Sequence, residues 1–205
     1  MTIGLVIPFN NCLLFVADGL RSPLVGSSDP VYDAQKIYRI TDKLAVITFG
    51  VHEVTNEVLR LIQVPYGFSS SFVCQLVDEL LEHVWANLNF AEHVNLTLPE
   101  MIAGFAIGGI AADGPFVGTV LRRHESRHTF ECSTDPRAIS LVANKIERAR
   151  TLYLEQHAPL VQLASELDHG GVEQALIQAA RRTIDQVAKY DISVGGKMTH
   201  LTICS

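Results

Sequence analysis

Thr2 is the first residue of this chain whose type and position suggest chemistry. It follows Met1, and a small second residue permits removal of the initiator methionine, so we expect a mature chain that begins with Thr2. A terminal threonine combines a hydroxyl nucleophile with its own α-amine, which titrates near ~7.7 to 8.0 and accepts a proton at neutral pH. With Met1 retained, that nitrogen is an amide and cannot act as the base. The pattern therefore predicts acyl-enzyme chemistry at a processed Thr2.

Three residues follow Thr2 at spacings that resemble a known family. The pair Ala17-Asp18 ends an apolar run, with Asp18 sixteen residues after Thr2, and Lys36 lies on the next β-rich run. Gly50 follows Lys36 by fourteen residues. This order is similar to that of the proteasome β-subunits and their bacterial relative HslV, which are N-terminal-nucleophile (Ntn) hydrolases.

The resemblance implies a role for each matched position. Asp18 would hold Lys36, and the positive charge of Lys36 would favour the alkoxide of Thr2 and tune its amine. The backbone N–H of Gly50 would stabilise the oxyanion of the tetrahedral intermediate. The implied activity is that of a threonine-type endopeptidase.

Two later segments, 133–136 and 191–196, also resemble motifs of this family, so the resemblance covers the whole chain. It implies that Ser133 and Asp191 hydrogen-bond around the α-amine and hold it in place, because a misoriented base is a poor one. It also implies a substrate groove, to which Ser22 would contribute its backbone. The groove residues are Arg21, Ser22, Thr48 and His52.

The sequence departs from the family pattern at several positions. Lys36 lies two residues later than the family spacing from Asp18, so the intervening loop must absorb an insertion. Val194 occupies a position where the family usually has a serine hydroxyl near the nucleophile, and the adjacent Ser193 points the other way if this segment is extended. Thr134-Asp135 replaces a small glycine pair. These changes bear on activity and on subunit packing.

Hydrophobic periodicity predicts the elements that would position these residues. Four β-rich runs separated by turn residues predict antiparallel hairpins at 3–8, 12–17, 36–40 and 44–48, with Asn10-Asn11 as a tight turn of positive φ. The apolar run 13–17 is continuous, which indicates a strand covered on both faces. Helical spacing follows near 54–62 and 73–84.

In the second half of the chain, predicted strands are again followed by predicted helices. Strand character returns at 101–110, 115–121 and 128–132, helical spacing at 139–149 and 172–184, and a last strand is expected at 198–203. We therefore predict one α+β domain over residues 1–205, a four-layer αββα sandwich of two antiparallel sheets flanked by helices, as the Ntn hydrolase resemblance also implies.

Composition excludes several classes of protein. The chain has 205 residues and a formal net charge of −6, which argues against a nucleic-acid binder, and 48% of its residues are hydrophobic, enough for a sizeable core. The longest near-apolar run, 101–112, is shorter than the ~18 residues that a membrane span requires. No secretory signal is evident at the start of the chain.

Cysteine and histidine spacing gives no metal motif. The four cysteines lie far apart in the sequence, so reduced thiols in the cytoplasm are expected. They are Cys12, Cys74, Cys132 and Cys204. His124 and His128 have metal-like spacing, yet the residues between them indicate a turn, so we expect neither a metal nor another cofactor.

The sequence favours a proteasome-like threonine peptidase that acts on unfolded proteins or peptides. Family resemblance implies self-association into a closed ring, with a stacked double ring expected and an ATP-dependent unfoldase as a candidate partner. Two alternatives stay open. One is a catalytically silent ring-forming subunit, which Val194 favours. The other is a related Ntn amidase or transpeptidase of narrow specificity, which a polar pocket formed by Arg21, Thr48 and His52 favours.

Overall fold

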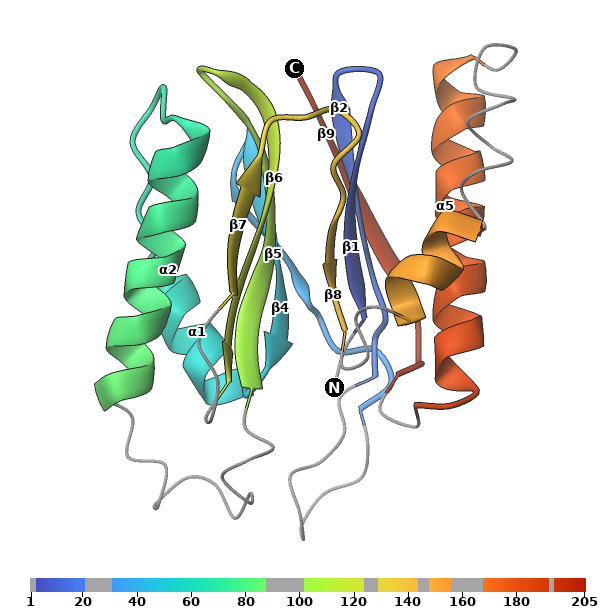
Figure 1. Cartoon of the computed structure of the whole chain (residues 1–205), viewed down its shortest axis with the longest axis horizontal. Helices are drawn as coiled ribbons and strands as arrows, with labels where there is room; N and C mark the ends of the chain where they lie inside the picture. Colours follow the sequence, from blue (N-terminus) through green and yellow to red (C-terminus); the bar gives the residue numbers. More distant parts are fainter. Residues whose placement is uncertain are drawn as a thin grey trace, which may run out of the picture.

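Two antiparallel sheets form the centre of the molecule (Figure 1). The computed structural model describes residues 3–20, 31–87, 102–123, 129–143, 148–155, 168–191 and 194–205. The first sheet has the strand order β8-β1-β2-β9, and the second has the order β3-β4-β5-β6-β7. The first-sheet strands are β1 (Gly4–Phe9), β2 (Cys12–Ala17), β8 (Ser140–Val142) and β9 (Thr199–Cys204). The second-sheet strands are β3 (Ile37–Thr41), β4 (Leu44–Gly50), β5 (Ile102–Ala111), β6 (Gly114–Arg123) and β7 (Thr129–Ser133).

Helices cover the outer face of each sheet (Figure 1). Helices α1 (His52–Leu61) and α2 (Ser70–Asn87) pack on the second sheet. Helix α5 (His169–Ala188) and the helical residues 148–155 pack on the first. The side chain of Asp168 caps α5 by accepting a hydrogen bond from the Gly171 N–H at 2.7 Å. The predicted αββα sandwich is confirmed.

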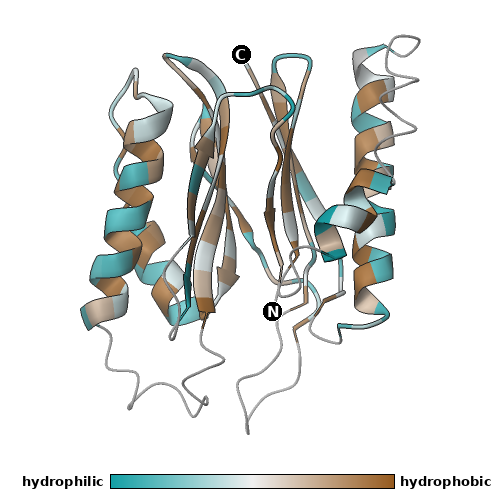
Figure 2. Cartoon of the chain, viewed as in Figure 1, coloured by the Kyte–Doolittle hydropathy of each residue, from teal (hydrophilic) through white to brown (hydrophobic). Residues whose placement is uncertain are grey.

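The core lies in three layers, one between the two sheets and one under each helical layer. Strand β2 shows why its apolar run is continuous. Phe15 faces the second sheet, whereas Leu14 and Val16 face α5, and all three side chains are fully buried. A strand covered on both faces needs apolar residues at every position. Figure 2 shows hydrophobic residues concentrated on the strands.

The hairpin between β1 and β2 turns at Asn10 and Asn11, whose φ angles are 42° and 62°. Asparagine tolerates this left-handed region better than most residues do, which makes it suitable for a two-residue hairpin. The turn pairs Phe9 with Cys12 and fixes the register of the whole hairpin, so that Gly4 pairs with Ala17. The predicted turn is confirmed, and it brings the residue after Ala17 back to the start of β1.

The helix predicted at 139–149 is wrong in its first part. Residues 140–142 form β8, which pairs with β1 so that Val142 lies opposite Gly4, and helical structure is described only from residue 148. A short buried strand and a helix give the same apolar spacing over three or four residues. Hydrogen bonding to the free edge of β1 favours the strand.

No helix in the described part of the chain is long and apolar enough to cross a membrane.

The prediction of four reduced cysteines is wrong for two of them. Cys12 on β2 and Cys204 on β9 face each other across the ladder and form a disulfide that joins residues 192 positions apart. Cys74 and Cys132 are free thiols. Sequence spacing cannot reveal the first pair, because the strands that hold it come from opposite ends of the chain.

We expect Cys204→Ser to lower the free energy of unfolding by about 2–5 kcal/mol, since the disulfide restricts the unfolded chain over a long loop. Urea denaturation without reductant measures the loss. Adding reductant should bring the wild-type protein to the level of the variant and leave the variant unchanged. Equal stability of the two proteins without reductant would contradict a formed disulfide.

Candidate active site

Asp18 is the centre of a polar cluster where β2 ends. Its side chain is fully buried, and its three described hydrogen-bond partners are all donors. The Ile3 N–H and the Lys36 ammonium both donate to Oδ1, each at 2.9 Å, and the Gly195 N–H donates to Oδ2 at 3.0 Å. Because a donor faces each oxygen, the arrangement fits an ionised carboxylate. It joins the start of β1, the residue before β3 and the segment before β9.

Lys36 is buried beside Asp18, with 6% of its side chain exposed. Its ammonium also donates to the Leu20 carbonyl at 2.5 Å, and its own carbonyl accepts the Thr48 N–H at 2.9 Å. Burial raises the pKa of the Asp18 carboxyl, and the charge and hydrogen bond of Lys36 oppose that shift. The Asp18 carboxylate and the Leu20 carbonyl hold the ammonium, and the bond from Thr48 fixes the backbone of Lys36.

Thr2 lies outside the described residues, but the atom to which it is bonded is placed. The Ile3 nitrogen and the Lys36 ammonium share one oxygen of Asp18, so the two nitrogens are no more than about 6 Å apart. The Ile3 nitrogen carries the carbonyl of Thr2. Lys36 and Asp18 therefore meet at the Ile3 nitrogen, the first described backbone atom after the predicted nucleophile.

Gly50 ends β4 at the same end of the second sheet as Lys36. Ile37 pairs with Ile47, which places Lys36 beside Thr48, two residues before Gly50. Gly50 has a φ of +86°, and a Cβ at this position would lie 1.8 Å from the Ile102 carbonyl oxygen. Only glycine fits this backbone without rearrangement. The chain turns here from β4 into α1, which begins at His52.

Two of the predicted groove residues, Thr48 and His52, lie next to this turn. Thr48 is buried on β4, and His52 is the first residue of α1. The Nε2 atom of His52 is 2.7 Å from the Nδ2 atom of Asn56, one helical turn later. No sequence motif includes Asn56, although its i, i+4 spacing from His52 puts both side chains on one face of the helix. Arg21 and Ser22 lie outside the described residues.

The segment that follows α5 reaches the cluster through its backbone. The Val194 N–H donates to the Asp191 carbonyl at 3.0 Å, Gly195 donates to Asp18, and the Gly195 carbonyl accepts the Leu20 N–H at 2.8 Å. Asp191 therefore lies near the cluster. The Val194 side chain is 4% exposed and packs in the core between the first sheet and α5. It supplies no hydroxyl to the site, and Ser193 lies outside the described residues.

Ser133 is not brought to this cluster. It ends β7 opposite Val117, and the sheet register places it level with Ala45, five residues and roughly 16 Å along the strand from Gly50. Its hydroxyl accepts the Asp135 N–H at 3.2 Å. In this part of the chain, β8 rather than β7 runs beside the start of β1. The motif resemblance at Ser133 was misleading, because a serine followed by a turn occurs at many strand ends.

We expect Ser133→Ala to leave peptide hydrolysis within about twofold of wild type, because a residue that touches neither substrate nor catalytic groups contributes little to the transition state. Steady-state kinetics with a fluorogenic peptide measures this. A large loss in kcat in a variant of unchanged stability would show that Ser133 takes part in catalysis.

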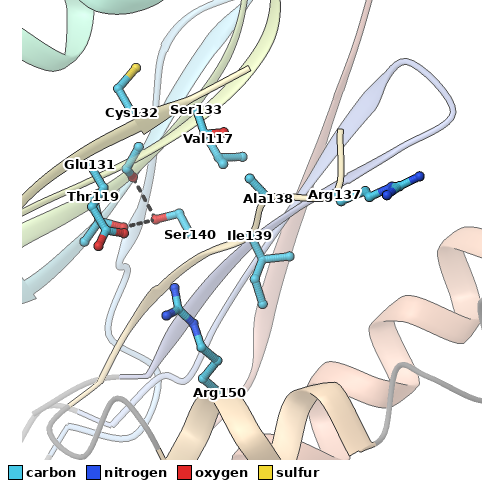
Figure 3. A pocket seen from close by; sticks show the side chains of 11 residues that line it. Val117, Thr119, Glu131, Cys132, Ser133, Arg137, Ala138, Ile139, Ser140 and Arg150 are labelled. Carbon is cyan, nitrogen blue, oxygen red and sulfur yellow. Dashed lines mark hydrogen bonds between the residues drawn. The ribbon is translucent and has the colours of Figure 1, made fainter. Parts of the chain in front are cut away.

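Ser133 borders a cavity of about 440 Å³ between β6, β7 and β8 (Figure 3). Inside it, the buried Ser140 hydroxyl lies 2.7 Å from the Thr119 hydroxyl and donates to the Gly118 carbonyl at 2.7 Å. Figure 3 shows Arg150 reaching into the cavity from the helical layer. None of Asp18, Lys36 and Gly50 lines this cavity.

No three histidine, cysteine, aspartate or glutamate side chains gather into a metal-type cluster in the described ranges. His124 and His128, the pair with metal-like spacing, lie outside those ranges. The groups that the structure does bring together around Asp18 are a buried carboxylate, an ammonium group and backbone N–H donors.

No family model and no curated protein sequence matches this chain. Solved structures do match it. Eukaryotic HslV from Trypanosoma brucei aligns with a TM-score of 0.56 and 13% identity, over 99% of each chain. The Gly-1 mutant of Anbu from Hyphomicrobium sp. strain MC1 aligns with a TM-score of 0.59 and 13% identity, over 100% of this chain and 88% of the other. Both are proteasome-type Ntn hydrolases, and this chain shares their fold.

Proposed function

We propose that this protein is a threonine-type peptidase whose nucleophile is Thr2, exposed by removal of Met1. The Thr2 hydroxyl attacks a peptide carbonyl while the α-amine of the same residue takes its proton. The tetrahedral intermediate collapses to an ester on Thr2, and the departing amine receives the proton. Water then hydrolyses the ester and restores the enzyme.

The observation that carries this proposal is the shared contact of Ile3 and Lys36 with one oxygen of Asp18. An ammonium held within about 6 Å of the Ile3 nitrogen is close to Thr2, which is bonded to that nitrogen. A nearby positive charge stabilises the alkoxide, which makes deprotonation of the hydroxyl easier, and lowers the pKa of the α-amine, which keeps more of it in the neutral form that accepts a proton. Burial strengthens this effect, since water does not screen it.

Gly50 supplies the second part of the proposed mechanism. Its N–H belongs to the turn between β4 and α1, at the end of the sheet where Lys36 also lies. We assign this N–H to the oxyanion and the neighbouring Thr48 and His52, with Arg21 and Ser22, to the substrate groove. Asp191 is assigned to positioning of the α-amine, because its backbone lies within the same hydrogen-bonded segment as Gly195.

The proposed substrates are unfolded proteins or peptides, and the proposed assembly is a closed ring of identical subunits, stacked as a double ring. The fold shared with HslV supports this assembly. An ATP-dependent unfoldase is the candidate partner. Such an assembly would restrict access to Thr2 to extended chains.

The buried Val194 favours one alternative, a silent ring-forming subunit. Where the related family usually places a hydroxyl near the nucleophile, this chain has a methyl-bearing side chain packed into the core. In that case the Asp18–Lys36 pair would serve only to fix the sheet ends. Retention of Met1 in the purified protein favours this alternative.

One experiment separates these functions. The purified protein is first weighed by intact-mass spectrometry to establish whether Met1 is absent, and is then incubated with an unstructured protein and, separately, with small amides. The proposal expects many peptide products, none from Thr2→Ala, and an oligomer of the same mass in both proteins by native mass spectrometry. Hydrolysis of small amides alone indicates the narrow amidase, and assembly without products from a chain that lacks Met1 indicates the silent subunit.

A further inference from the structure

The two free cysteines meet at the interface between α2 and the second sheet. Cys74 on α2 and Cys132 on β7 are 58 positions apart in the sequence, yet their sulfur atoms are 2.9 Å apart. That separation is only about 0.9 Å longer than the ~2.05 Å of a disulfide bond. Together with Cys12 and Cys204, this contact places all four cysteines of the chain in pairs.

A glycine on β6 makes room for this contact. Gly118 pairs with Cys132, and a Cβ at Gly118 would lie 2.6 Å from the Cys74 sulfur. A side chain at this position would therefore displace the Cys74 sulfur from its contact with Cys132. Cys132 is one of the residues that line the cavity next to Ser140, but its side chain points away from Ser140 (Figure 3) and packs against the same core as α2. The sulfur of Cys74 is thus held against β7 by the packing of the whole helix.

The two thiols differ in exposure and in acidity. Cys74 is fully buried, whereas Cys132 is partly exposed. The hydrogen bond from the Cys74 thiol lowers the pKa of Cys132, and the same bond, followed by burial, raises the pKa of Cys74. Cys132 is therefore the thiol that forms a thiolate and meets a reagent from solvent, with Cys74 behind it.

We propose that Cys74 and Cys132 form a dithiol site that a peroxide oxidises to a second intramolecular disulfide, which ties α2 to β7. The Cys132 thiolate attacks one peroxide oxygen, the O–O bond breaks, and the products are a sulfenic acid and, with a proton, water. Cys74 loses its proton and attacks the sulfenic sulfur, which releases a second water. The two thiols lose two electrons, and hydrogen peroxide is reduced to two waters.

This site is separate from the proposed peptidase centre. Cys132 lies level with Val46, four residues and roughly 13 Å along the strand from Gly50. Oxidation therefore acts on stability rather than on the chemistry at Thr2. The new bond closes a loop of 58 residues, and we expect the melting temperature to rise by about 5–10 °C.

The test uses the purified full chain and hydrogen peroxide as the reagent. Before treatment, alkylation in denaturant, which exposes the buried Cys74, should label both Cys74 and Cys132. After treatment, we expect a mass loss of about 2 Da, loss of both labels, and a linked peptide containing Cys74 and Cys132 in a non-reducing digest. The rise in melting temperature should accompany the link and disappear with reductant.

The Cys74→Ala variant and the wild-type protein unfolded in urea provide the controls. In the variant, Cys132 has no partner, so we expect a sulfenic acid that dimedone traps and no rise in melting temperature. In urea, the link should form at least tenfold more slowly, since the fold no longer holds the sulfurs together. Two reactive thiols remaining in the folded wild-type protein after excess peroxide would overturn the proposal, as would equally fast linkage in urea.

Discussion

Replacing Lys36 by methionine is expected to reduce the rate of peptide hydrolysis by roughly 10²–10⁴-fold, the range that a positioned group assisting proton transfer contributes. Methionine keeps an unbranched chain in the buried space but removes the ammonium that shares Asp18 with the Ile3 N–H. Without that charge, the Thr2 alkoxide and the neutral amine both lose stabilisation. Steady-state kinetics on a protein whose N-terminus is verified by mass measures the effect.

Stability needs a separate measurement, because Lys36→Met leaves the Asp18 carboxylate buried without its cation. Breaking a buried ion pair on one side typically costs about 3–5 kcal/mol. The double variant Asp18→Asn/Lys36→Met has no charge at either position, so we expect it to regain part of the free energy of unfolding in urea denaturation. It should stay inactive. Recovery of activity together with stability would show that the pair serves folding alone, and a folded Lys36→Met with wild-type turnover would show that the ammonium is not needed.

Replacing Gly50 by alanine is expected to lower kcat by roughly 10²–10³-fold, the usual effect of losing one oxyanion donor. An alanine Cβ would lie 1.8 Å from the Ile102 carbonyl oxygen, so the turn between β4 and α1 must move. Movement redirects the Gly50 N–H, and the positive φ of +86° adds strain of about 1–2 kcal/mol for a residue with a side chain.

Gly67→Ala is the matched control for this variant. Gly67 also has a positive φ, of +72°, but nothing lies within 4 Å of the added Cβ. It should therefore show the strain of about 1–2 kcal/mol in the free energy of unfolding and no change in kcat. If Gly67→Ala loses as much activity as Gly50→Ala, the loss reports general destabilisation and the oxyanion role of Gly50 is wrong.

The sequence predicted the parts of this fold that depend on burial and turn chemistry. The run from Leu13 to Ala17 indicated a strand covered on both faces, and Asn10-Asn11 indicated the hairpin that returns the chain to Asp18. The family resemblance singled out Asp18 and Lys36, although their spacing differs from the family's by two residues, and the structure joins them by an ion pair of 2.9 Å. Each of these signals is local in the sequence or comes from a family resemblance.

The parts that the sequence did not predict depend on pairing between distant segments. Residues 140–142 have helical spacing but add to the edge of β1, and Ser133 lies level with Ala45, five strand residues from Gly50. The Ile3 and Gly195 N–H groups that hold Asp18 are backbone atoms, which carry no sequence signal. Likewise, no spacing rule reveals that Cys12 faces Cys204.

The most direct test of the central claim is covalent labelling of Thr2. The protein, with Met1 confirmed absent, is incubated with a threonine-directed β-lactone or epoxyketone, and the adduct is located by intact-mass measurement and peptide sequencing. We expect one adduct per chain on Thr2, none on Thr2→Ala, and slow labelling of Lys36→Met. An adduct that persists in Thr2→Ala, or no adduct on the processed wild-type chain, would contradict the assignment of Thr2 as the nucleophile.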